Sequence, residues 1–189
     1  MRVSDLTAEV VLPLLRGRLG MPYRHLPECA STQRLFAADA PEGATATTDH
    51  QTEGRGRLGR TWEDVPGRAL LCSVVLRPLR AVSDWPQLSL IAGEAVAAAV
   101  PLDASVLEPN DVVVKGRKVA GILSEAADGR VVLGIGVNVN QAADELPADA
   151  RKPTTSLRLE LGRELERAPL LAAILSELER RYYTWCGVS

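Results

Sequence analysis

Cysteine is scarce in this sequence, which has three cysteines among its 189 residues. Cys29, Cys72 and Cys186 are far apart and form no Cys-x-x-Cys pair. An odd number of cysteines at such spacings argues against a disulfide framework and against a structural zinc site. His25 and His50 also lack the spacing of a metal site, so we expect neither to bind a metal or to act in catalysis.

Long hydrophobic runs and an excess of positive charge are missing as well. The longest apolar run, residues 95–102, is far shorter than the roughly 20 residues that cross a bilayer. Residues 1–5 show no apolar core of a signal peptide. A formal net charge of −2 argues against a general surface for nucleic acids or anionic membranes. We therefore expect a cytoplasmic protein without a membrane partner.

The residues that are present fit one globular domain, with 46% hydrophobic and 24% charged residues. Hydrophobic periodicity predicts helices and strands in mixed order, which indicates an α+β domain. Its sheet should be mixed, mostly antiparallel, and packed with helices. We expect helices over residues 7–19 (kinked or split at Pro13), 31–38, 84–100, 155–161 and 169–185. We expect strands over residues 23–27, 44–50, 69–76, 111–114, 117–125 and 131–140.

The last of these strands carries small residues on one face. Side chains alternate along a strand, so Gly134, Gly136 and Asn138 should share a face. A glycine in a strand often marks the close approach of a ligand or of another backbone. The pattern therefore fits the floor of a groove and fits tight helix-on-sheet packing equally well. On the preceding hairpin, the same alternation predicts a shared face for Lys118, Ala120 and Ile122.

The most unusual segment is residues 54–62, which holds three glycines, three arginines and a final tryptophan. Glycine lets backbone amides approach a ligand closely. The planar fork of arginine suits phosphate and carboxylate, and Trp62 offers a flat face to a ring. In a chain that is not basic overall, this segment predicts a mobile clamp for a small anionic ligand.

Two other interpretations of this segment are less favoured. The pattern Gly-x-Gly-x-x-Gly at residues 54–59 matches a dinucleotide fingerprint, which must open a helix about 20 residues before an acidic residue. Residues 61–67 have the composition of a loop, and residues 66–82 contain no Asp or Glu, so we do not expect a Rossmann dehydrogenase. An RNA-binding segment rich in arginine and glycine would have flanking basic repeats, and none are present.

A second cluster joins residues 108–111 with residues 118–121. Taken alone, Asn110 and Asp111 are typical of a turn before a strand, and Lys118 is typical of an exposed strand. Neither piece by itself indicates a function.

Together these motifs resemble the catalytic domain of biotin protein ligases over about residues 25–140. The matching pieces, in chain order, are Ser31-Thr32, His50 to Trp62, Pro109-Asn110-Asp111, Lys118 to Leu123 and Gly134 to Asn138. The resemblance implies a class II synthetase-like fold, a mixed sheet with helices on one side. It also implies a two-step reaction. The carboxylate of biotin attacks the α-phosphate of ATP, with Mg²⁺ on the phosphates, and a lysine of a biotin carboxyl carrier domain then attacks the biotinyl-5′-adenylate.

The resemblance also implies roles for individual residues. The residues expected to act in catalysis are Lys118, Arg55 and Arg57. The residues expected to bind biotin are Ser31, Thr32, Gln51, Gly54, Arg55, Lys118 and Gly121. The residues expected to bind ATP or the adenylate are Arg57, Arg60, Trp62, Asn110, Asp111 and Asn138. The residues that hold the metal are not indicated.

Residues 1–189 should then form one catalytic domain, without the DNA-binding extension or the small C-terminal β-barrel of some relatives. The partners should be biotin, ATP and a carrier domain, with no DNA, and a homodimer stays open. The family has Lys-Trp before Pro-Asn-Asp, whereas this chain has Leu107-Glu108. If Glu108 faces the phosphates, its charge would oppose ATP binding. The alternatives are a non-catalytic or attenuated binder of biotin or its adenylate, and a relative that acts on lipoate or octanoate.

Overall fold

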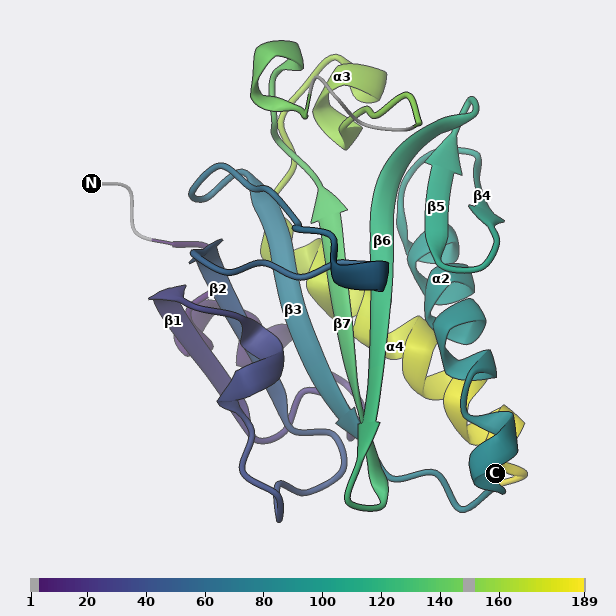
Figure 1. Cartoon of the computed structure of the whole chain (residues 1–189). Helices are drawn as coiled ribbons and strands as arrows, with labels where there is room; N and C mark the ends of the chain where they lie inside the picture. The colour runs from purple at the N-terminus through teal and green to yellow at the C-terminus, as the bar shows by residue number, and fades with distance from the viewer. Residues whose placement is uncertain (1–3, 148–151, 189) are drawn as a thin grey trace.

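A computed structural model describes residues 4–147 and 152–188 as one mixed, seven-stranded sheet packed with helices (Figure 1). The strand order is β1-β2-β3-β7-β6-β5-β4. Strands β1 and β2 pair in parallel, and every other neighbouring pair is antiparallel. The strands are β1 Tyr23–Cys29, β2 Thr45–Gln51, β3 Ala69–Leu76, β4 Ala104–Leu107, β5 Asp111–Val114, β6 Arg117–Ala127 and β7 Arg130–Asn138.

Helices α2 (Gln87–Ala99) and α4 (Arg167–Cys186) lie together behind the sheet in the view of Figure 1. Their apolar sides and the back of the sheet enclose the hydrophobic core, which includes Leu88, Leu171 and Ile135. Short helical segments are α1 Ala8–Val11, α3 Leu157–Leu161, and the 3₁₀ turns Leu12–Leu14, Thr32–Leu35, Arg57–Gly59, Val82–Asp84 and Ala143–Glu145. The front of the sheet is thus left for the segments between strands. No described helix is both long enough and apolar enough to cross a membrane.

Local sequence explains the central strands well. Strand β3 is buried at every position because it lies inside the sheet with both faces covered. The β5–β6 and β6–β7 hairpins turn at Lys115-Gly116 and Asp128-Gly129, where both residues of each pair have positive φ. This conformation is the one that tight antiparallel hairpins require. The predicted strands and hairpins are therefore confirmed to within a few residues.

Three expectations about elements need correction. The helix expected over residues 7–19 ends by Leu14, because Pro13 has no N–H to continue it. The helix expected over residues 31–38 is a single 3₁₀ turn, Thr32–Leu35. The sequence analysis did not predict β4, an edge strand of four residues that is too short to show a clear alternation.

The expected face of strand β6 is also wrong. A register shift against β5 leaves Val119 as an extra residue between the pairs Val112–Ala120 and Val113–Lys118. Such a bulge changes the phase of the strand. Lys118 consequently lies on the front face with Gly121, whereas Ala120 is in the core.

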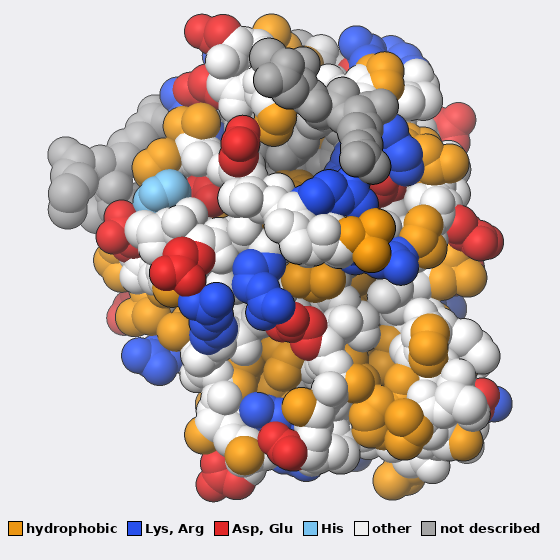
Figure 2. Space-filling model, viewed as in Figure 1, with side chains coloured by type: hydrophobic (Ala, Val, Ile, Leu, Met, Phe, Trp, Pro, Cys, Tyr) orange, Lys and Arg blue, Asp and Glu red, His pale blue; other side chains and the backbone are white. Residues whose placement is uncertain are grey.

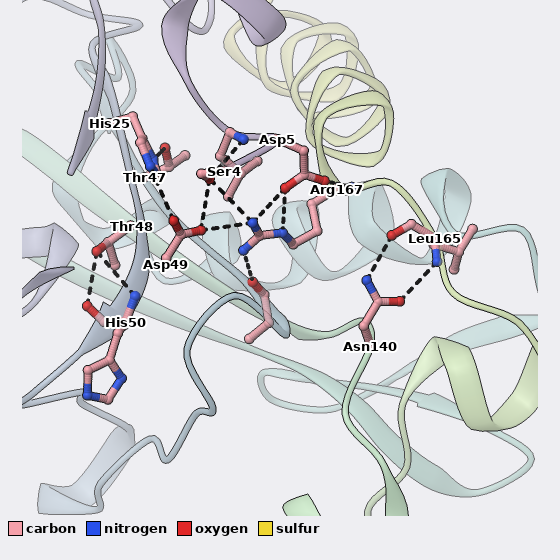
Figure 3. Close-up of polar contacts among 12 residues, drawn as sticks. Ser4, Asp5, His25, Thr47, Thr48, Asp49, His50, Asn140, Leu165 and Arg167 are labelled. Atoms are coloured by element: carbon pink, nitrogen blue, oxygen red, sulfur yellow. Dashed lines mark hydrogen bonds and ion pairs between the residues drawn. The ribbon is translucent and has the colours of Figure 1, made fainter. Parts of the chain in front are cut away.

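A buried arginine ties the N-terminal segment and α4 to strand β2 (Figure 3). The guanidinium group of Arg167 lies 2.6 Å from Asp5 and 2.8 Å from Asp49, and it donates to the carbonyl oxygen of Ala69. Ser4 donates to Asp49 as well. Because Asp49 precedes Gln51 on the same strand, this network holds the end of β2 that enters the glycine-arginine segment.

Candidate functional site

A pocket of about 650 Å³, open to solvent, lies on the front of the sheet over β6 and β7. Its lining includes ten of the thirteen predicted site residues. These are Ser31, Thr32, Gln51, Arg55, Arg57, Arg60, Trp62, Asn110, Lys118 and Gly121. In Figure 2, blue Lys and Arg side chains gather across the middle of this face, beside a hollow lined in orange. A concave surface with an apolar floor and a few convergent polar groups is typical of a small-molecule site.

The segment Gly54 to Trp62 crosses in front of the sheet as a small, irregular hairpin (Figure 1). The amide of Trp62 donates to the carbonyl oxygen of Gly54 over 3.0 Å, and the amide of Gly56 donates to the carbonyl oxygen of Arg60 over 2.7 Å. At the tip, Leu58 has positive φ and an 88% exposed side chain. The segment is therefore closed at its neck and held weakly at its tip.

The ring of Trp62 lies on a floor made of two glycines. A Cβ atom at Gly136 would come within 2.8 Å of the ring, and one at Gly121 within 3.1 Å. These two glycines are directly paired across β6 and β7. The glycine face therefore belongs to the pocket, which decides between the two interpretations that the sequence left open. Gly134 on the same face is covered by Gln33.

One end of the pocket is uncharged and rich in hydrogen-bonding groups. The side-chain carbonyl of Gln51 accepts from the amide of Thr32 over 2.9 Å and from its hydroxyl group over 3.2 Å. That hydroxyl group also contacts the hydroxyl group of Ser73 at 2.7 Å. Ser31 lies next to them and is buried. This end is suited to a neutral, polar group of a ligand, such as a urea.

The centre of the pocket holds the ammonium group of Lys118, 5.6 Å from the centre of the Trp62 ring. Its counter-ion is Asp111, whose Oδ1 lies 2.8 Å from Lys118 Nζ. The other oxygen, Oδ2, lies 2.8 Å from Lys152 Nζ. Burial alone would raise the pKa of Asp111, but the two lysines hold that pKa below its ordinary value. Asp111 is therefore a carboxylate at neutral pH.

The arginines divide into one that is paired and two that are not. Arg55 makes a two-pronged ion pair with Glu125 on β6, with contacts of 2.7 and 3.0 Å. Within the described part of the chain, no carboxylate pairs with Arg57 or Arg60. Arg60 instead donates to the carbonyl oxygen of Arg57. The pocket mouth thus carries uncompensated positive charge, which favours an anionic ligand.

Three predicted site residues lie outside the lining of the pocket. Gly54 permits the neck of the segment, because a Cβ there would meet the carbonyl oxygen of Trp62 at 2.3 Å. Asp111 does not line the pocket itself but forms an ion pair with Lys118, which does. Asn138 donates to the carbonyl oxygen of Thr155 and accepts from Gln141. Its role with a nucleotide stays a prediction, as do the roles of the other residues.

Leu107 and Glu108 are exposed and do not line the pocket. In this structure the carboxylate of Glu108 therefore does not face the centre of the site.

Sequence reasoning missed several polar residues around the pocket. Gln33 donates to the carbonyl oxygens of Leu123 and Val132. Asp64 accepts from the amide of Gln51 and pairs with His50 at 2.9 Å. It thereby ties the chain after Trp62 to the end of β2. The sequence has no local signal for these contacts.

The three cysteines are free as expected, and burial raises the pKa of Cys72 to about 12.

Residues 26–141 match the model of the biotin/lipoate A/B protein ligase family. The chain belongs to this family. It is 39% identical over 166 residues to the bifunctional ligase/repressor BirA of Bacillus spizizenii, covering 81% of this chain and 51% of that protein. It is 40% identical over 153 residues to the biotin–[acetyl-CoA-carboxylase] ligase of Mycobacterium tuberculosis, covering 76% and 56%. The chain thus spans about half the length of the curated relatives it matches.

Solved structures in the same family confirm the fold. A biotin protein ligase from Aquifex aeolicus, in complex with biotin and ATP, superposes with a TM-score of 0.75 at 30% identity, covering 89% of this chain and 73% of that one. The expected resemblance to biotin ligases and the expected mixed, helix-packed sheet are both confirmed.

Proposed function

We propose that this ligase-family domain activates biotin with ATP and transfers the biotinyl group to a lysine of a carrier domain. The observation that carries the proposal is the convergence of Lys118, Arg55 and Arg57 with the polar Thr32–Gln51 end around one pocket. Relatives named as biotin ligases, and a similar structure with biotin and ATP, support this choice of substrates. The single sheet and core support one catalytic domain.

In the first step, a carboxylate oxygen of biotin attacks the α-phosphorus of ATP. A bond forms between this oxygen and the α-phosphorus. The bond from the α-phosphorus to the oxygen that bridges it to the β-phosphate breaks, and pyrophosphate leaves with Mg²⁺. Both reactants are anions, so positive groups near the new bond lower the barrier. Lys118 would supply one such charge, and Arg55 and Arg57 would hold the carboxylate and the phosphate. Mg²⁺ bound to ATP would offset part of the charge on its phosphates.

In the second step, the amine of a carrier lysine attacks the carbonyl carbon of the mixed anhydride. An amide bond forms, AMP leaves and the amine loses a proton. The glycine-arginine segment would cover the adenylate and exclude water, which otherwise hydrolyses the anhydride. Ser31, Thr32 and Gln51 would hold the ureido end of biotin. Trp62 would pack against the adenylate, with Arg60, Asn110, Asp111 and Asn138 near the nucleotide. A homodimer is an open part of the proposal.

The test is incubation with biotin and α-labelled MgATP, followed by separation of biotinyl-adenylate and then by addition of a biotin carboxyl carrier domain. Lys118→Met removes the charge while keeping most of the side chain. We expect it to slow adenylate formation by about 100-fold, the usual cost of losing one charge-stabilising group. Its thermal unfolding should match that of the wild type.

Adenylate formed by the wild type and transferred to the carrier would support the proposal. Biotin binding without adenylate would contradict it and favour a non-catalytic binder. Displacement of labelled biotin by lipoate at equal concentration would favour the lipoate-type relative instead.

A further inference from the structure

Two lysines share one nearly buried carboxylate beside the pocket. The side chain of Asp111 is 9% exposed, and each of its oxygens lies 2.8 Å from a different ammonium group. Lys118, 24% exposed, lines the pocket, whereas Lys152, 44% exposed, lies outside its lining. The group therefore carries one more positive than negative charge.

The backbone fixes Lys152 in this position. The amide of Lys118 donates to the carbonyl oxygen of Pro153, and the amide of Thr155 donates to the carbonyl oxygen of Lys118, both over 2.8 Å. Residues 153–155 thereby extend along β6 next to Lys118, in a parallel bridge. Lys152 precedes this bridge, and its side chain contacts the Asp111 oxygen that Lys118 does not contact. The contact is thus built by main-chain pairing.

We propose that Lys152 is a positioning residue that keeps Asp111 neutralised and thereby lets Lys118 move onto the reacting ligand. The proposal rests on the proposed function and adds to it a residue outside the pocket. Lys118 pairs with Asp111 in the unliganded site, yet the reaction needs its charge at the biotin carboxylate and the α-phosphate.

The charge of Lys152 determines how much free energy it costs Lys118 to leave Asp111. If Lys118 left Asp111 without a substitute, a nearly buried carboxylate would lose its partner, which is costly. With Lys152 in place, Asp111 keeps one ammonium group at hydrogen-bond distance. Lys118 can then exchange one anionic partner for another at small cost. Without Lys152, Asp111 would compete with the ligand for Lys118.

Lys152→Met removes the charge, and Lys152→Arg keeps it. We expect Lys152→Met to slow single-turnover adenylate formation about tenfold, equivalent to about 1.4 kcal/mol in the barrier. Biotin affinity, measured by calorimetry, should fall by no more than the rate does, because Asp111 would then compete with the biotin carboxylate for Lys118. Lys152→Arg should recover most of the rate. Lys115→Met is the matched control, since Lys115 lies in the nearby β5–β6 turn and pairs with Glu160 instead.

The route through Asp111 is tested by combining substitutions. Asp111→Asn removes the charge that Lys152 neutralises, so Lys152→Met should cost little further rate in that background. Losses that multiply would overturn the proposal, because Lys152 would then act independently of Asp111. A rate for Lys152→Met equal to that of the wild type would also overturn it.

A second readout does not depend on catalysis. Trace labelling of amines with acetic anhydride, read by mass spectrometry, reports how available the Lys118 amine is. Lys152→Met should slow labelling of Lys118 several-fold, and Lys115→Met should not. Unchanged labelling would overturn the proposal. If the wild type formed no adenylate, the proposed function would fail, whereas this labelling would still decide whether the two lysines compete for Asp111.

Discussion

At the scale of single residues, the absence of a side chain at Gly136 and Gly121 decides where Trp62 lies. A methyl group added at Gly136 would overlap the indole ring, and one added at Gly121 would crowd it at 3.1 Å. The bulge at Val119 then turns Lys118 onto the same surface. A flat ring and a positive charge are thereby placed next to each other, 5.6 Å apart.

Gly136→Ala should displace Trp62, because the added Cβ would come within 2.8 Å of the ring. We expect biotinyl-adenylate to bind about tenfold more weakly, a loss of about 1.4 kcal/mol, measured by calorimetry. In a Trp62→Ala background, Gly136→Ala should have little effect. A persistent tenfold loss there would refute the explanation.

At the scale of elements, the glycine-arginine segment is held firmly at its neck and weakly along the rest of its length. The neck is closed by the hydrogen bond from the amide of Trp62 to the carbonyl oxygen of Gly54, and the Asp64 carboxylate accepts from the amide of Gln51, whereas the tip is exposed. The ion pair between Arg55 and Glu125 ties the segment to β6, and the two side chains are 42% and 35% exposed. Partly exposed pairs of this kind contribute at most about 1 kcal/mol. An anionic ligand that attracts Arg55 would therefore break this ion pair at small cost in free energy.

Glu125→Gln should loosen the segment in the unliganded protein. We expect trypsin to cleave after Arg57 and Arg60 up to about fivefold faster, in line with about 1 kcal/mol. Biotin with MgATP should protect both variants. Glu177→Gln, which removes two ion pairs on α4, with Arg180 and Arg181, serves as the control. Equal cleavage with and without ligand would argue against closure of the segment.

At the scale of the whole molecule, Arg167 joins three parts that are distant in sequence: the N-terminal segment, β2 and α4. Its side chain is 5% exposed and lies between Asp5 and Asp49. Burial would raise the pKa of Asp49, but His25 and Arg167 hold that pKa below its ordinary value. A carboxylate with a lowered pKa stabilises the fold above its unfolded pKa and loses this contribution as pH falls.

Arg167→Met should lower the free energy of unfolding by about 2 kcal/mol at pH 7, because it leaves the half-buried carboxylates of Asp5 and Asp49 without the charged group that hydrogen-bonds to them. The difference from the wild type should shrink as pH falls below about 4, the ordinary pKa of an aspartate, and through the lowered pKa of Asp49. Urea unfolding between pH 7 and pH 3 measures both effects. Arg180→Met removes an exposed ion pair on the same helix and should cost less than about 1 kcal/mol. A difference that does not change with pH would exclude Asp49 as the cause.

The sequence by itself determined most of the strands, both hairpin turns and the residues that gather in the pocket. These features depend on local rules: the continuous apolar run of β3, glycine at the turns, and the density of arginine and glycine in residues 54–62. The family motifs added the expectation that Ser31, Gln51, Lys118 and Gly136 belong to one catalytic domain.

The tertiary structure alone decided which face Lys118 takes, and which charges share Asp111 and Arg167. The bulge at Val119 arises from pairing with β5 and leaves no mark in the spacing of apolar residues. Lys152, Glu125 and Arg167 reach their partners across 41, 70 and 118 positions of sequence, respectively. Such contacts depend on where separate elements come to lie, which no local pattern in the chain encodes.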